Sequence, residues 1–444
     1  MQRFFTSLLV LLSSTAAVQA QTVLLEEAPL KDSHFRIELN LTLDGVIRLR
    51  DGTPSSLKQA VSARHEFSER VLESSNGLVD KSARFYHHAR ATLESGGIAS
   101  TRTLRPQSRL MIADRARDLP VVYAQKALTQ EEFELTEHFD TLTLPGLLPD
   151  KEVAVGATWK VRDLVAQVLC DLDGLSKHDL TCKLEKVESN LATVSVAGKV
   201  EGIDLGARVN MIVNASLVFD VAARRIISVD WKQSDQRDQA PASPEMSADV
   251  HITLKRTPTD EPPELNNFAL VPLLGKNAMR LSYRDPQGRY ELEHARDWHL
   301  TARTDRYLVL RLFDRGEFTV QATIMPWKTV APGKTMTKDE FTKMLQTPGW
   351  DPRIPLNKEV EEVKQDLGYQ IYRTGAQGFL DGEEVVQYFY LIADKHGHQV
   401  VTTFTMRPAQ VQRLETLDLD LVSRLRLPEA TEEREQQPQE KAGP

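Results

Sequence analysis

Residues 298–327 contain two runs of alternating side chains joined by a short turn, and no other stretch constrains the fold as tightly. The first run places Leu308, Leu310 and Leu312 on one face of a strand. After the turn at 314–317, the second run gives one apolar face, made of Phe318, Val320, Ala322 and Ile324. This period-two alternation around a Gly-containing turn predicts a β-hairpin with one buried and one wet face.

The same alternation recurs in the first half of the chain. It is present at 35–43 and, in a longer form, at 207–219. Further strands are predicted at 60–72, 180–184, 192–196, 226–231 and 248–254. The apolar spacing of 81–93 fits a helix and a strand equally well. Consecutive strands with short polar turns favour an antiparallel sheet with one covered face.

Helices are predicted where their start signals and apolar stripes coincide. Thr129 with Glu132 and Thr337 with Glu340 have the spacing of capping boxes. The apolar stripe of 161–169 predicts a further amphipathic helix. Such helices can cover the N-terminal sheet directly, or its long strands can curve around a ligand cavity. Ordinary core residues at the inward positions favour a filled interior.

The organisation that follows is an α+β chain of two domains, each a mainly antiparallel sheet with packed helices. A length of 444 residues exceeds what one core supports. Four prolines in 257–274 predict a linker at 257–275, which separates a β-rich meander domain (35–256) from a second domain (276–428). Residues 1–20 have the features of a secretory signal peptide, and the polar, acidic segment 429–444 is predicted to be disordered.

The second domain carries a family resemblance. The segments YELEHARDWHL, DRYLVLRLFDRGEFTVQATIMP, VVQYFYLI, QVVTTFTM and LVSRLRLP lie in 276–428. In their order and pattern they resemble the PsbP-like fold, although 294–297 lacks the family's proline. The resemblance implies an α/β/α sandwich and an exported module that docks on partners or binds small ligands, usually without catalysis. The resemblance assigns no functional residue to this chain, because the matching positions are structural. The whole chain also resembles uncharacterised exported bacterial proteins.

The two cysteines, Cys170 and Cys182, are candidates for a disulfide. Disulfides persist in the oxidising compartments that exported proteins reach. A bridge closing this short loop would contribute about 3 kcal/mol in the loop-entropy account. The alternative is a pair of buried thiols, since free cysteine is among the most buried residue types.

Candidate metal ligands are sparse. His87 and His88 are adjacent, so they do not point together on a strand or a helix. His65-Glu66 lacks the second histidine of a zinc-protease motif, and 171–182 lacks the glycine and glutamate of a calcium loop. His396-Gly397-His398 is the best metal candidate, but a plain turn built on the glycine is favoured. Asp235, Asp238 and Glu245 are predicted to lie in a solvated polar loop.

No recognised catalytic motif is present, including the nucleophile elbow, the phosphate loop and the dinucleotide fingerprint. A formal charge of −8 argues against nucleic-acid binding, and beyond the leader no apolar run approaches a membrane span. We therefore expect a soluble exported protein of the periplasm or extracellular space, without cofactor or metal. Its expected role is non-enzymatic, through a protein partner in the cell envelope or a small ligand. The alternatives are a carrier of an apolar, lipid-like ligand in the N-terminal sheet and an exported hydrolase with an unrecognised site.

Overall fold

The computed structural model describes residues 22–27, 30–49, 55–75, 77–115, 121–240, 243–266, 279–314, 317–346, 359–364, 368–380, 382–414 and 416–428. The predicted signal peptide, the tail 429–444 and much of the predicted linker lie outside these ranges. Within them, no helix combines the length and the apolar character that crossing a membrane requires.

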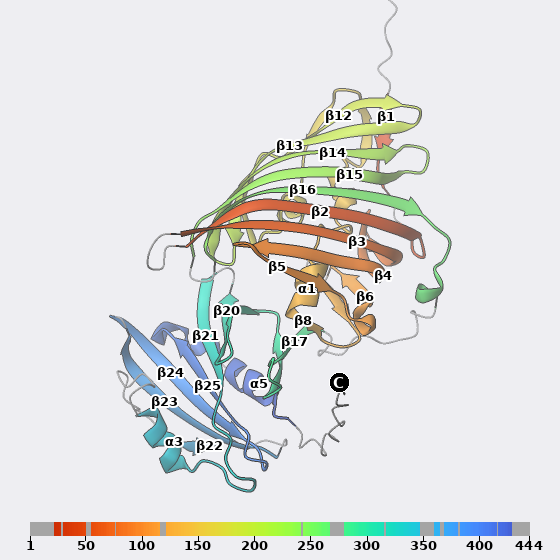
Figure 1. The fold of residues 1–444 in the computed structure, drawn as a ribbon. Helices are drawn as coiled ribbons and strands as arrows, with labels where there is room; N and C mark the ends of the chain where they lie inside the picture. Colours follow the sequence, from red (N-terminus) through yellow and green to blue (C-terminus); the bar gives the residue numbers. More distant parts are fainter. Residues whose placement is uncertain are drawn as a thin grey trace, which may run out of the picture.

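A curved sheet of thirteen strands dominates the first 258 residues (Figure 1). Its main path runs β10-β12-β13-β14-β15-β16-β2-β3-β4-β6-β7, with β11 beside β13 and β5 beside β4. Neighbouring strands are antiparallel, and β16 returns to pair with β2 so that Ile252 lies opposite Leu41. The strands are β2 (His34–Leu49), β3 (Ser55–Ser75), β4 (Leu78–Ser95), β5 (Ile98–Thr103), β6 (Leu110–Asp114), β7 (Val121–Ala124), β10 (Thr158–Lys160), β11 (Gly174–His178), β12 (Thr181–Glu188), β13 (Leu191–Asp204), β14 (Ala207–Asp220), β15 (Arg225–Arg237) and β16 (Glu245–Pro258).

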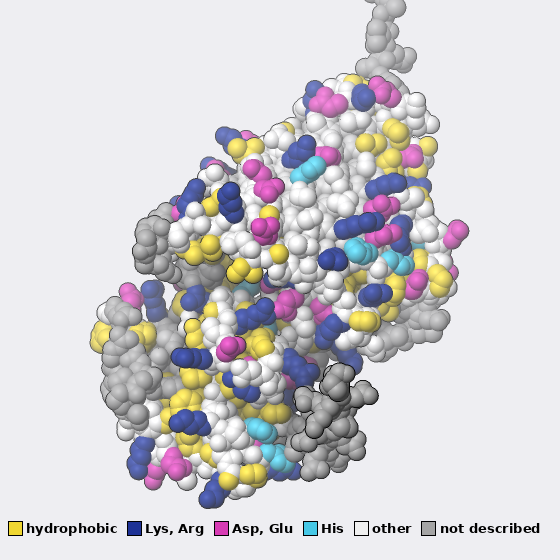
Figure 2. Space-filling model, viewed as in Figure 1, with side chains coloured by type: hydrophobic (Ala, Val, Ile, Leu, Met, Phe, Trp, Pro, Cys, Tyr) yellow, Lys and Arg dark blue, Asp and Glu magenta, His cyan; other side chains and the backbone are white. Residues whose placement is uncertain are grey.

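Alternation decides which face of this sheet is buried. Along β14 the odd-numbered residues from Ala207 to Val213 are buried and the even-numbered ones are exposed, as the sequence predicts. The ambiguous segment 81–93 is part of strand β4. Figure 2 shows basic and acidic side chains scattered over the large sheet. We call the apolar side the inner face and the polar side the outer face.

Two short helices and a loop lie against the inner face. They are α1 (Gln130–Thr136), α2 (Asp163–Leu169) and the loop that contains the 3-10 turn η3 (Leu144–Leu147). Thr129 and Glu132 form the predicted capping box of α1. Phe139 packs on Trp231 of β15 with ring centroids 5.3 Å apart. Beside them, β1 (Thr22–Leu25) and β9 (Lys151–Ala154) form a separate two-stranded sheet.

The second half of the chain contains a seven-stranded sheet of order β19-β20-β21-β25-β24-β23-β22. Its strands are β19 (Trp298–Arg303), β20 (Leu308–Asp314), β21 (Glu317–Pro326), β22 (Glu361–Glu362), β23 (Gln370–Leu380), β24 (Glu383–Ala393) and β25 (Gln399–Met406). The predicted hairpin is confirmed as β20–β21, with Leu310 opposite Ala322. Apolar side chains of α3 (Lys338–Leu345) belong to one core, and those of α4 (Val411–Leu414) and α5 (Leu417–Ser423) belong to another. The capping box of α3 at Thr337 is also confirmed.

A small sheet joins the two halves of the chain. Its order is β26 (Leu425–Arg426), β18 (Glu291–Ala295), β17 (Arg280–Arg284) and β8 (Leu128–Thr129). The pairing of β17 with β8 is parallel and joins residues more than 150 positions apart. Leu281 of β17 belongs to the hydrophobic core of the first half. The start of α1 is thereby fixed to the second half of the chain.

Candidate ligand cavity

A cavity of about 440 Å³ lies between the inner face of the large sheet and helices α1 and α2; we call it the inner cavity. From the sheet it is lined by Leu41, Leu43, Met211, Met246, Val250 and Ile252. From the helices and their flanks it is lined by Phe133, Phe139, Val168 and Leu169. Its volume and largely apolar lining are typical of small-molecule sites.

The filled interior that the sequence favoured is present over much of the sheet, where inner-face residues such as Ile37, Leu39 and Trp231 are buried, but not beside the inner cavity. Helices α1 and α2 have only seven residues each, while the strands that they face have thirteen to sixteen. A seven-residue helix is only about 10 Å long, so the two cannot cover such a face. Apolar residues such as Met211 and Ile252 belong to the core, as the sequence predicts, and also border this cavity.

Four carboxyl groups line this space. Asp140 accepts hydrogen bonds from the backbone N–H groups of Leu142 (3.2 Å) and Thr143 (2.7 Å), and among the described residues the other three have no such partners on the backbone. Glu137 is the residue at which α1 ends, Asp171 follows the end of α2, and Asp235 lies on β15. Burial raises the pKa of Glu137 to about 8, with a further contribution from the nearby charge of Asp171. Burial also raises the pKa of Asp171, and that of Asp235 to about 6. We call these three residues the acidic trio.

The solvent contact of the trio depends on the cavity itself. The side chains of Glu137 and Asp171 are exposed in terms of surface area, although protein surrounds them on most sides. Such a combination arises when a side chain borders an internal space rather than the outer surface. Asp235 accepts a hydrogen bond from Gln233 (3.0 Å), which in turn accepts one from the buried indole of Trp231 (2.8 Å). The other carboxylate oxygen of Asp235, Oδ1, is buried and has no hydrogen-bond partner in the structure.

Three arginines also line the inner cavity, and each has hydrogen-bond or ion-pair partners outside the trio. The charges of Arg237 and Arg296 nevertheless offset part of the rise in the pKa values of the trio carboxyls. Arg84 is fully buried and donates to Glu69 (2.9 Å) and Thr141 (2.7 Å). Arg237 forms an ion pair with Asp204. Arg296, from the second half of the chain, is described separately below. Among the described residues, none forms an ion pair with a member of the trio.

Arg296 enters the inner cavity from the loop between β18 and β19. It donates to the carbonyl oxygens of Met279 (3.0 Å) and Val122, and its guanidinium lies 4.6 Å from the ring centre of Phe133 on α1. Burial lowers the pKa of Arg296 to about 10, so it keeps its charge at neutral pH. Arg296 is thus a direct contact between the second half of the chain and the wall of the cavity.

Two histidines, His65 and His138, lie beside a smaller cavity of about 110 Å³ next to α1, and His138 also lines the inner cavity. His138 is within hydrogen-bond distance of the Tyr86 hydroxyl (2.9 Å), and His65 Nε2 is within that distance of the Leu135 carbonyl (2.8 Å). Burial lowers the pKa of both imidazoles, that of His65 to about 4. They are neutral near pH 7 and help to hold α1 against β3 and β4.

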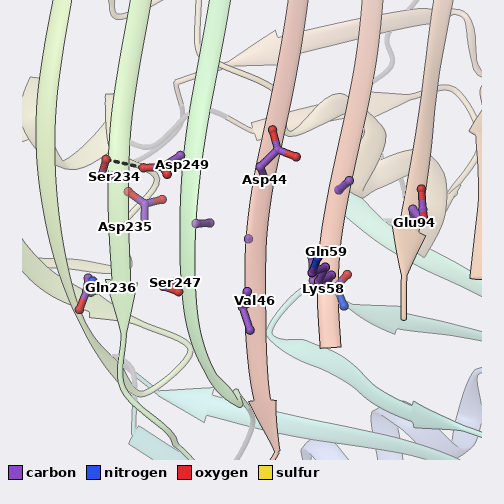
Figure 3. Close-up of a pocket in the computed structure, with 13 residues that line it drawn as sticks. Asp44, Val46, Lys58, Gln59, Glu94, Ser234, Asp235, Gln236, Ser247 and Asp249 are labelled. Atoms are coloured by element: carbon purple, nitrogen blue, oxygen red, sulfur yellow. Dashed lines mark hydrogen bonds between the residues drawn. The ribbon is translucent and has the colours of Figure 1, made fainter. Parts of the chain in front are cut away.

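A second hollow of about 580 Å³ lies near the bend of β2 at Gly45 (Figure 3). A Cβ at position 45 would lie 2.8 Å from the Ser247 carbonyl oxygen, so this close strand approach requires glycine. The hollow is bordered by exposed polar groups such as Asp44, Lys58 and Glu94. Ser234 donates to Asp249 across its rim (2.5 Å). It lacks the apolar lining of the inner cavity, and we do not assign it a ligand.

The cysteines singled out in the sequence are both buried. Cys170 ends α2 beside Asp171, Cys182 lies on β12, and both are free thiols in the structure. Burial raises the pKa of each to about 12, which makes both unreactive at neutral pH. The disulfide between them stays a prediction.

The histidine pairs have structural roles in the part of the chain that the structure describes. His87 is within hydrogen-bond distance of Ser68 (2.8 Å). At 396–398, Asp394 accepts from the backbone of His396 and His398 (both 2.9 Å), and Gly397 has a φ of +88°. This is the turn that the sequence favoured there. The described residues contain no group of three or more His, Cys, Asp or Glu side chains that could hold a metal ion.

The solvated loop predicted to contain Asp235 is wrong. Strand β15 continues to Arg237 and β16 begins at Glu245, so Asp235 lies within a strand with its carboxyl on the inner face. Sequence reasoning also missed Glu137 and Asp171 as members of one site. The usable signal was their position: each carboxylate follows an apolar helical stripe that was predicted to cover the sheet.

No protein-family model matches the chain, and no curated protein matches it in sequence. Among solved structures, it is similar to cyanobacterial PsbP from Synechocystis, as the resemblance of 276–428 predicts: the identity is 14%, the match covers 35% of this chain and 97% of that one, and the TM-score is 0.26. It is also similar to a Bacteroides thetaiotaomicron protein, with 11% identity, coverage of 33% of this chain and a TM-score of 0.25. A third similar structure is lipovitellin, with 9% identity, coverage of 52% of this chain and a TM-score of 0.30. The chain spans 48% of the Bacteroides protein and 26% of lipovitellin.

Proposed function

We propose that this chain is an exported, non-enzymatic binding protein that carries a small, largely apolar ligand in the inner cavity. The observation that supports this most is the part of the inner face beside α1 and α2, where about 440 Å³ is bordered by aliphatic and aromatic side chains. Apolar surface in contact with water is unfavourable, by about 25 cal/mol per Å². A ligand that fills the cavity would recover part of that free energy.

The test fills the cavity by mutation. Met211 and Ile212 are neighbours on β14; Met211 lines the inner cavity, whereas Ile212 is exposed on the outer face. In Met211→Trp the indole occupies the space, so binding of an apolar fluorescent probe such as N-phenyl-1-naphthylamine should be lost. Ile212→Trp adds the same side chain to the other face and should leave probe binding unchanged. Equal probe binding by both variants, with both folded by circular dichroism, would refute the carrier function.

For the second half of the chain we propose a separate PsbP-like domain, from 276 to 428, that docks on a protein partner in the cell envelope. Helices packed against both faces of its seven-stranded sheet support this proposal, as does the exported character of the sequence. Cross-linking of the full chain in the exporting cell should recover one partner reproducibly. Recovery of no specific partner would refute the docking role.

An acid–base hydrolase is the second candidate function, and the acidic trio is the observation that favours it. Carboxyl groups held in one cavity with raised pKa values are typical of general acids and bases. Turnover of chromogenic esters or glycosides by the purified protein, lost in Glu137→Gln, would support this candidate. A broad substrate panel without turnover would refute it.

A further inference from the structure

We propose that the inner cavity and the smaller cavity beside α1 form one elongated site, and that its ligand has an unbranched aliphatic chain whose end lies in the smaller cavity. This inference rests on the proposed carrier function and adds the shape and class of the ligand to it. We call the smaller cavity, of about 110 Å³, the chain pocket.

The two cavities meet where α1 ends. Leu41 of β2, Glu137 at the end of α1 and His138 after it line both of them. Because the same three residues belong to both walls, the chain pocket continues the inner cavity past the end of the helix. A ligand that extends beyond Leu41 and His138 therefore enters the chain pocket.

The register of the large sheet shows the same continuity. Two rows of apolar inner-face residues run across four neighbouring strands beneath both cavities. In the order β16, β2, β3 and β4, the rows are Ile252, Leu41, Ala63, Ala91 and Val250, Leu43, Val61, Leu93. The members on β16 and β2 line the inner cavity, and those on β3 and β4 line the chain pocket. One apolar surface thus underlies the whole site.

Short side chains provide the space at the far end of the first row. Where β16 and β2 carry Ile252 and Leu41, β3 and β4 carry Ala63 and Ala91, both of which are buried. Leu135 of α1 borders the chain pocket as well. Neighbouring strands are about 4.8 Å apart, so the two additional strands lengthen the site by about 10 Å.

The sizes of the two cavities assign the parts of the ligand. The chain pocket has about 110 Å³ and the inner cavity about 440 Å³, four times as much. The bulkier part of the ligand therefore lies in the inner cavity, and only a narrow chain end fits in the chain pocket. A compact ring system would fill the inner cavity alone.

The polar groups of the chain pocket favour an uncharged chain end. Arg102 of β5 forms an ion pair with Glu134 of α1, so neither charge needs a ligand. Burial lowers the pKa values of His65 and His138, and both imidazoles are neutral near pH 7. A charged end placed beyond the junction would lose its hydration without a free partner of opposite charge, whereas a methyl end loses nothing.

The test measures affinity against chain length. In the mature chain, n-octanol, n-decanol and n-dodecanol displace N-phenyl-1-naphthylamine, and the displacement gives their dissociation constants. Each added methylene should tighten binding to the wild type about fourfold, which corresponds to about 0.8 kcal/mol per buried CH₂. In Ala63→Leu the chain pocket is filled, so octanol should bind as in the wild type. The gain from octanol to dodecanol should shrink by at least about tenfold, the equivalent of two methylenes left outside the site.

Two further variants separate filling of the pocket from an effect on folding. Ala91→Leu fills the same pocket from β4 and should give the same result. Ser62→Leu places a leucine on the exposed outer face of β3, next to Ala63, and should match the wild type at every chain length. Circular dichroism and the urea midpoint establish that each variant is folded.

The results distinguish the elongated site from the carrier function on which it rests. A wild-type chain that gains no affinity from octanol to dodecanol would overturn the elongated site and leave the carrier function standing. Equal gains in the wild type and in a folded Ala63→Leu or Ala91→Leu variant would overturn it as well. If neither the alcohols nor the naphthylamine probe bind the wild type, the carrier function itself is wrong.

Discussion

The stability of the protein should fall with rising pH because of Glu137, and Glu137→Gln should remove that dependence. The pKa of Glu137 is raised from 4.5 to about 8, so the folded state keeps a proton that the unfolded state releases. Between these two values the folded protein binds more protons, and the free energy of unfolding decreases as pH rises. The contribution is fully present below pH 4.5 and is lost as the pH passes 8.

The size of the effect follows from the shift after a correction for solvent. At 1.36 kcal/mol per pKa unit the full shift corresponds to about 5 kcal/mol, which applies only to a carboxyl without water contact. Because the Glu137 side chain borders the water-accessible cavity, screening reduces this to about 1–2 kcal/mol. A protonated glutamic acid and a glutamine have similar shapes and polarity. The variant should therefore equal the wild type near pH 5 and exceed its stability by about 1–2 kcal/mol near pH 9.

Urea unfolding at pH 5, 7 and 9 measures the difference between the two proteins. Taking the difference cancels the other titrating groups of the fold, including Asp204 and Asp235, whose pKa values are also raised by burial, and the buried histidines, whose pKa values are lowered. Glu38→Gln, on the exposed outer face of β2, serves as the control, and its stability relative to wild type should not change with pH. If the difference in free energy of unfolding between Glu137→Gln and wild type is the same from pH 5 to pH 9, the raised pKa of Glu137 is refuted.

Three further predictions concern the structure around the cavity. Thr129→Ala removes the cap of α1 and should lower the free energy of unfolding by about 1 kcal/mol, whereas Thr129→Ser should retain most of it. Arg84→Met leaves Glu69 buried without its cation and should cost about 3–5 kcal/mol, visible as a lower urea midpoint, while the double variant with Glu69→Leu should recover much of that loss. Alkylation followed by mass measurement should modify Cys170 and Cys182 only after unfolding, since both are buried; absence of modification even in denaturant without reductant would show the disulfide instead.

The strand content was predictable because it depends on local alternation. In runs such as 207–219 and 308–324 the alternation of apolar and polar residues predicts which side chains are buried, because successive side chains of a strand face opposite sides. The two capping boxes were predictable for the same reason, because their residues are only three positions apart. The pairing of β8 with β17 was not predictable, because two residues on each side carry no pattern and are more than 150 positions apart.

The inner cavity was not predictable from local patterns, because it depends on helices α1 and α2 being too short to cover the whole inner face of the large sheet. Leu41, Met211 and Ile252 would read the same in the sequence whether a helix or empty space faced them. The members of the acidic trio are separated by 34 and 64 positions in the sequence. Taken alone, Glu137 and Asp171 are polar residues at the ends of predicted helices, and Asp235 is part of a predicted polar loop. Only the sheet curvature and the shortness of α1 and α2 bring them to one wall.

Arg296 makes the inner cavity a property of the whole chain rather than of its first half. Its guanidinium rests on Phe133 of α1, and the capped start of that helix is fixed by the pairing of β8 with β17. The negative charge of Glu137, at the other end of α1, raises the pKa of Arg296 against the effect of burial. A ligand that changes the ionisation of Glu137 would thus act on Arg296 through its charge. By reciprocity, a partner that moved the loop of Arg296 would change the affinity of the cavity, which gives the two proposed binding roles a physical connection.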